Sequence, residues 1–133
     1  MLKLMKKIER RIFVIGINSF KYENLSLEVQ KLFHTVRDIA VPKTYLNEIM
    51  EWAKKEFVGE KNFYKSESNI DLINWLKLID KDVILVSRGD PLWYGIGRIL
   101  INNFSREELI FYPGNTSLQL VFSKLKRSWQ NIK

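Results

Sequence analysis

The stretch VILVSRGDP, residues 83–91, joins an apolar run directly to a sharp polar turn. Its first part, Val83 to Ser87, is continuous and rich in β-branched side chains, as expected for a strand that is buried on both faces. Its second part, Arg88 to Pro91, contains a glycine for a tight turn and a proline suited to the first turn of a helix. The stretch therefore predicts a buried strand, a turn and a helix in succession.

The same alternation of strand and helix occurs earlier in the chain. Residues 12–17, IFVIGI, form another short apolar run that ends at polar residues, which indicates a second buried strand. Ser26 is the expected N-cap of the next helix, because apolar residues recur with helical spacing up to Val36. The apolar run at 39–42 is too short to assign.

Two helices with a weak strand between them are predicted for the middle of the chain. Thr44 is the expected N-cap of the first helix, whose apolar spacing continues up to the punctuating Gly59. The weak strand is placed at residues 63–64. Ser68 and Asp71 have the spacing of a capping box, which opens the second helix.

The chain after residue 91 completes the alternation. Apolar spacing predicts a helix over 93–104 and a strand over 109–112 that stops at a Pro-Gly pair. A last helix, with apolar residues over 118–125, is capped by Asn115 or Thr116. Strands that alternate with helices predict an α/β fold with a mainly parallel sheet and helices on both faces. A length of 133 residues suits one such domain.

The amino-acid composition is that of an ordinary folded protein. It also excludes some kinds of catalytic and binding site. Hydrophobic residues make up 46% and charged residues 28% of the sequence. Because the chain has no cysteine, it forms no disulfide and no thiolate nucleophile, which fits the cytoplasm as the expected location. The single histidine, His34, has no cluster of ligand-type residues near it in sequence, so no metal site is expected. No apolar run approaches the ~20 residues of a transmembrane helix, and no membrane partner is expected.

The net charge of +7 is compatible with a polyanionic partner, whether nucleic acid, an anionic membrane or a polycarboxylated small molecule. Basic residues concentrate at the two ends of the chain, and an ordinary solvated surface explains that pattern equally. The four tryptophans are dispersed and do not alternate with a basic stripe. This argues against a stacking platform for nucleic acid, so no nucleic-acid partner is expected.

Three predicted loops lie where α/β sheets bind ligands. Such sheets bind ligands beyond the carboxyl ends of their strands, which are followed here by residues 16–19, 88–95 and 113–117. The second loop has two interpretations. It holds a polar ligand with helix N–H groups beside Asp90, or it is a tight turn in which Asp90 only caps the helix. Helix capping also explains the polar residues of the third loop.

Three segments in this order resemble the tetrapyrrole (precorrin) methylase family. VIGI at 14–17, GDPLWYGIG at 89–97 and PGNTSLQ at 113–119 match the glycine-containing end of the family's first strand, its Gly-Asp-Pro loop and its Pro-Gly loop. YGIGR at 94–98 is similar in particular to the C5-methylating N-terminal part of the precorrin-6Y C5,15-methyltransferases. The resemblance covers essentially the whole chain.

The resemblance implies that residues 1–133 are the N-terminal α/β domain of an S-adenosylmethionine-dependent methyltransferase of cobalamin biosynthesis. The family's second domain is absent, so a truncated enzyme is expected. A precorrin (tetrapyrrole) is the implied substrate, and pairing into a homodimer is the implied assembly. No catalytic acid or base is assigned and no metal is required. Matched by position, the cofactor contacts fall on Gly16, Ser19, Arg88, Gly89, Asp90, Trp93, Thr116 and Ser117.

The sequence differs from the family at two places. Asn18 and Ser19 stand where the family usually has glycine and proline, in the cofactor loop. Residues 41–45, VPKTY, stand where it has a Gly-Gly-basic-His stretch, at the substrate end.

Two alternatives to a methyltransferase domain stay open at this point. A non-catalytic α/β module that uses the family core for interaction or ligand sensing would explain the changes at Asn18 and Ser19. A basic nucleic-acid-binding domain would require the positive charges to converge on one face, and its binding would weaken steeply with salt.

Overall fold

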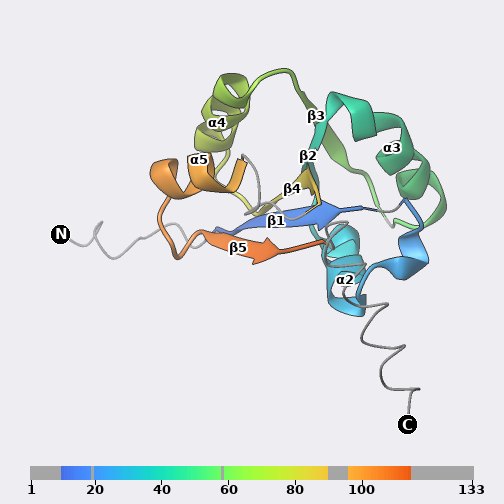
Figure 1. Ribbon diagram of the computed structural model, residues 1–133. Coiled ribbons are helices and arrows are strands. Elements are labelled where there is room, and N and C mark those ends of the chain that lie inside the picture. The colour runs from blue at the N-terminus through green and yellow to red at the C-terminus, as the bar shows by residue number, and fades with distance from the viewer. Residues whose placement is uncertain (1–9, 19, 58, 90–95, 115–133) are drawn as a thin grey trace, which may run out of the picture.

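The computed structural model describes residues 10–18, 20–57, 59–89 and 96–114. Strands and helices alternate throughout this part of the chain, so the predicted α/β fold is confirmed (Figure 1). The elements in chain order are β1 (Ile12–Ile17), η1 (Tyr22–Asn24), α2 (Leu27–Thr35), β2 (Asp38–Pro42), η2 (Lys43–Tyr45), α3 (Leu46–Lys55), β3 (Asn62–Ser66), α4 (Asn69–Leu78), β4 (Val83–Arg88), α5 (Ile96–Asn103) and β5 (Leu109–Tyr112).

The five strands form one sheet in the order β3-β2-β4-β1-β5. Every neighbouring pair is parallel, as predicted. β1 and β4 lie side by side over their full length, with Ile12 opposite Val83 and Ile17 opposite Arg88. All of β1 and all of β4 except Arg88 are buried, which explains why both strands are continuous apolar runs in the sequence.

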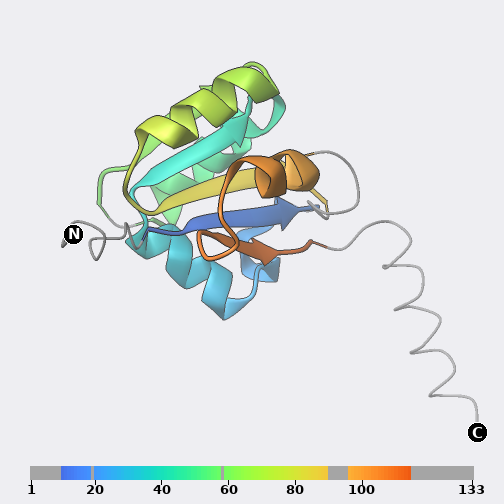
Figure 2. The same ribbon diagram turned by 90° about the vertical axis from the view of Figure 1, so that its left-hand side faces the viewer.

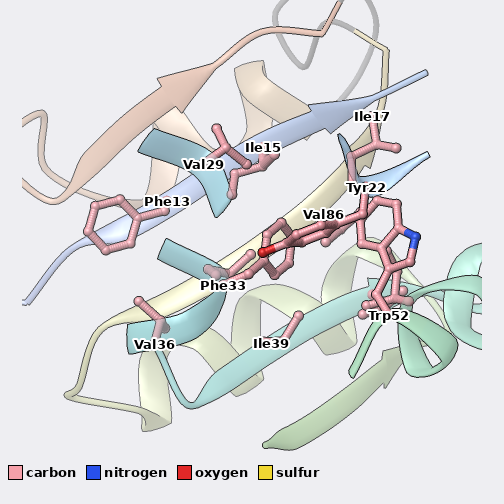
Figure 3. Packing of buried hydrophobic residues seen from close by; sticks show 13 residues of the cluster. Phe13, Ile15, Ile17, Tyr22, Val29, Phe33, Val36, Ile39, Trp52 and Val86 are labelled. Atoms are coloured by element: carbon pink, nitrogen blue, oxygen red, sulfur yellow. The ribbon is translucent and has the colours of Figure 1, made fainter. Parts of the chain in front are cut away.

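Helices cover both faces of the sheet (Figures 1 and 2). Because strand side chains alternate between the two faces, Ile15 and Ile17 of β1 pack with α2 and α3, whereas Ile12 and Val14 pack with α4 and α5. Figure 3 shows the first of these clusters, in which Phe33 of α2 packs against the sheet. The core thus has two layers, one on each side of the sheet.

Helix caps bear out part of the sequence prediction. Ser26 Oγ accepts a hydrogen bond from the Val29 amide at 3.2 Å, and Ser68 Oγ accepts one from the Asp71 amide at 3.2 Å. Both serines are therefore N-caps, as predicted.

Two predicted features of α3 are wrong. Thr44 lies inside the 3-10 turn η2, and the N-cap of α3 is Tyr45, which makes no side-chain capping bond. The turn follows β2 without a break, so no residue before the helix has a side chain placed to cap it. The helix also ends at Lys55, before the Gly59 at which its end was expected. The predicted last helix lies outside the described residues.

Arg10 makes three hydrogen bonds at the amino edge of the sheet, which is the edge where the parallel strands begin. Its guanidinium is buried and donates hydrogen bonds to Glu108 Oε2 at 3.0 Å, to the Leu76 carbonyl at 3.1 Å and to the Ile79 carbonyl. The two carbonyls belong to the end of α4, where helix carbonyls lack intrahelical partners. Arg10 thus links α4 to the loop before β5.

After β1 and after β4, the chain continues to helices on opposite faces of the sheet. β1 leads to α2, which packs on one face, and β4 leads to α5, which packs on the other. A crevice at the carboxyl ends of two such strands is where open α/β sheets bind ligands. None of the helices in the described part of the chain is long and apolar enough to cross a membrane.

Candidate functional site

Three glycines meet at the carboxyl edge of the sheet. Gly16 lies in β1, Gly89 follows β4 and Gly114 lies just beyond β5. The Gly89 amide donates a hydrogen bond to the Ile17 carbonyl at 3.1 Å, and the Gly114 amide donates one to the Gly89 carbonyl at 3.3 Å. The ends of three strands are thereby joined through their backbones.

The glycines are required because the backbones approach so closely. A Cβ added to Gly16 would overlap the carbonyl oxygen of Gly89, and one added to Gly114 would lie 2.7 Å from the carbonyl oxygen of Gly16. Gly89 has a φ of +52°, a conformation that side chains disfavour. The strand ends can therefore pack backbone against backbone only because these residues are glycines.

A cavity of about 540 Å³ opens beside this meeting point. It lies between the ends of β1 and β5 and the segment that leads into α2. Its volume suits a small-molecule ligand. Its polar side chains include Asn18, Asn24 and Ser26. The full lining is Ile15, Gly16, Ile17, Asn18, Asn24, Leu25, Ser26, Val29, Tyr112, Pro113 and Gly114.

Tyr112 contributes a protonated phenol to the cavity wall. Its hydroxyl donates a hydrogen bond to Glu28 Oε2 at 2.8 Å. Burial raises the pKa of Tyr112, and the hydrogen bond and negative charge of Glu28 raise it further. A phenol with a raised pKa keeps its proton at neutral pH, so Tyr112 serves here as a hydrogen-bond donor and not as a base.

Arg88 lies at the same edge but outside the cavity. Its side chain is exposed, and its Cζ atom lies 5.9 Å from the centre of the Tyr45 ring, in the loop after β2. The Tyr45 hydroxyl donates a weak hydrogen bond to the Ile17 carbonyl at 3.4 Å. The Arg88 guanidinium is thus placed over an aromatic ring on the β2 side of the crevice.

The structure brings together the three predicted site residues that it describes. Gly16, Arg88 and Gly89 all lie at the carboxyl edge, and Gly16 alone of these lines the cavity. The other predicted contacts lie outside the described residues: Ser19, Asp90, Trp93, Thr116 and Ser117.

Several residues at this edge were missed by sequence reasoning. The sequence does contain a feature that places Gly114 at this edge, because Gly114 stands in a Pro-Gly pair directly after a strand. No sequence feature places Asn24 or Tyr112 in the cavity wall, since their position there depends on how β5 and α2 lie against β1. Tyr45 was noted only as a departure from the family pattern. Within the described residues, no group of three or more His, Cys, Asp or Glu side chains is placed to hold a metal ion.

The described residues thus form a parallel α/β domain with a cavity at the carboxyl edge of its sheet. No protein-family model matches the chain. Over 49 residues the chain is 37% identical to a cobalt-precorrin-7 C(5)-methyltransferase of Salmonella typhimurium (strain LT2), and equally to one of Salmonella typhi. The match covers 36% of this chain and 24%, about a quarter, of the length of each relative. Over that segment, the predicted relationship to the tetrapyrrole methylases is confirmed.

Proposed function

We propose that this chain is the S-adenosylmethionine-binding N-terminal domain of a precorrin methyltransferase, which transfers a methyl group to a carbon of the macrocycle in cobalamin biosynthesis. The observation that carries the proposal is the meeting of Gly16, Gly89 and Gly114 beside a cavity at the carboxyl edge of the sheet. The segment that is 37% identical to C(5)-methyltransferases supports the same function. It also favours C5 as the carbon that is methylated.

The residues at the carboxyl edge fit a nucleotide-like methyl donor. Gly16 and Gly114 line the cavity, and neither has a side chain that would narrow it. Asn18 offers a side-chain amide along the cavity, a group of the kind that recognises hydroxyl, amino and carboxylate groups. We propose that the cofactor contacts also include Asp90 and Thr116, in the two loops that follow Gly89 and Gly114.

The chemistry requires positioning more than it requires an acid or a base. S-adenosylmethionine supplies a methyl group on a sulfonium: a nucleophilic carbon of the macrocycle bonds to the methyl group as its bond to sulfur breaks, and S-adenosylhomocysteine leaves as the neutral thioether. The contribution of the protein is then to align the two reactants and to exclude water. The joined strand ends suit this task, because hydrogen bonds between Ile17, Gly89 and Gly114 tie the ends of three strands to one another.

Calorimetric titration with S-adenosylhomocysteine tests the proposal. We expect the chain to bind this product, and Asp90→Ala to weaken the binding by at least about tenfold, as for loss of a charged hydrogen-bonding partner. Asp80→Ala is the matched control, because Asp80 precedes β4 and so lies at the opposite edge of the sheet. No detectable heat at millimolar ligand would contradict the proposal and favour the non-catalytic module.

A further inference from the structure

Arg88 is the one charged residue of β4, a central strand of the sheet. β4 is buried from Val83 to Ser87, and the Arg88 side chain is exposed at its carboxyl end. Arg88 projects to the face that carries α2 and α3, because Val86 packs on that face and strand side chains alternate. The guanidinium therefore lies on the same face of the sheet as the cavity, but at the β4 end, whereas the cavity lies between β1 and β5.

An anchored aromatic platform holds this guanidinium. Tyr45 lies beneath it, and the Phe20 ring meets the Tyr45 ring edge-on with centroids 4.7 Å apart. The Phe20 carbonyl accepts a hydrogen bond from Trp52 Nε1 at 2.9 Å, and Trp52 is a core residue (Figure 3). The platform is thus continuous with the hydrophobic core, so the Arg88 side chain is positioned and not merely solvated.

The charge of Arg88 has no carboxylate partner within the described residues. The ion pairs in that part of the chain join Arg10 to Glu108, Lys54 to Glu51, and Lys65 to Glu67. A guanidinium over an aromatic ring keeps its edge N–H groups available in a planar fork. That fork matches the two oxygens of a carboxylate.

We infer that Arg88, placed over Tyr45, is a docking position for a carboxylate of the macrocyclic substrate. This inference rests on the proposed function, since precorrins carry many acidic side chains. Arg88 does not line the cavity assigned above to the methyl donor. We therefore assign Arg88 to the substrate, in place of the cofactor contact expected from the family resemblance. Phe20, which is 37% exposed, offers apolar surface beside the docked group.

Binding of uroporphyrin III, a porphyrin with eight carboxylates, is the direct test. Quenching of tryptophan fluorescence measures its affinity for the full chain. We expect Arg88→Gln to weaken binding about tenfold, as for loss of a charged hydrogen-bond donor, and Arg88→Lys to weaken it less. Tyr45→Leu, which removes the supporting ring, is expected to weaken it about threefold. Arg37→Gln is the matched control, because Arg37 is exposed and immediately precedes β2, at the opposite edge.

Two further measurements separate this inference from the proposed function. A porphyrin with N-methylpyridinium arms in place of carboxylates should bind Arg88→Gln no more weakly than the unaltered chain. Arg88→Gln should also leave the affinity for S-adenosylhomocysteine unchanged. The inference is overturned if Arg37→Gln weakens uroporphyrin binding as much as Arg88→Gln does, if the unaltered chain does not bind uroporphyrin, or if Arg88→Gln weakens both ligands equally. Failure of the unaltered chain to bind S-adenosylhomocysteine would instead contradict the proposed function.

Discussion

Gly16 and Gly59 are glycines for different physical reasons. A Cβ on Gly16 would overlap the Gly89 carbonyl, whereas Gly59 has open space around it and a φ of +84°. We expect Gly16→Ala to lower the free energy of unfolding by about 3 kcal/mol, because the strand ends must move apart. Gly59→Ala should lower it by only about 1 kcal/mol, through backbone strain alone. Urea unfolding measures both, and equal losses would contradict the close approach at Gly16.

Glu108 makes stability depend on pH at the amino edge. Burial raises its pKa, but hydrogen bonds from Ser105 and Arg10 and the charge of Arg10 outweigh burial, so the pKa is lowered overall. A pKa that folding lowers stabilises the protein above the pKa of the unfolded chain, and this stability is lost as the pH falls through the folded-state pKa.

Glu108→Gln tests this account of the amino edge. The change should cost about 1 kcal/mol at neutral pH, and the difference from the unaltered chain should shrink as the pH falls through the acidic range. Urea unfolding at several pH values measures it. A difference that stays constant down to the lowest pH would show that the charge of Glu108 is not involved.

At the scale of elements, Ser68 and Thr44, which both precede a helix, should differ sharply in how much their change to alanine lowers the free energy of unfolding. Ser68 caps α4 through the Asp71 amide, so Ser68→Ala should lower the free energy of unfolding by about 1 kcal/mol. Thr44 lies in η2 and is exposed, so Thr44→Ala should change it by less than about 0.5 kcal/mol. Thermal unfolding followed by circular dichroism compares the two, and a larger loss for Thr44→Ala would restore the cap predicted from sequence.

The elements that sequence predicts well are those with a local signature. β1 and β4 are continuous apolar runs because both faces of the sheet are covered. Ser26 and Ser68 mark the beginnings of α2 and α4, because their side chains cap these helices. β2 has no such signature. It is a strand because β3 and β4 pair with it on both sides, which depends on segments distant in the sequence.

At the scale of the whole molecule, the sheet order assembles the candidate site. The rule that ligands bind at the carboxyl ends of parallel strands predicts that Gly16 and Gly89 lie at one edge of the sheet, and the two do meet there. The rule does not give the strand order, which places β1 between β4 and β5. For this reason the cavity wall at Tyr112, and the platform of Tyr45 under Arg88, could not be predicted from the sequence.

The central claim is that the joined strand ends form the methyl-donor site. Nuclear magnetic resonance of the isotope-labelled chain, titrated with S-adenosylhomocysteine, tests it directly, because the sequence contains only 6 glycines and their amide signals are readily distinguished. We predict progressive shifts of the Gly16, Gly89 and Gly114 amides, with the Gly59 amide unchanged. Shifts confined to the amino edge of the sheet, or no shifts at saturating ligand, would contradict the claim.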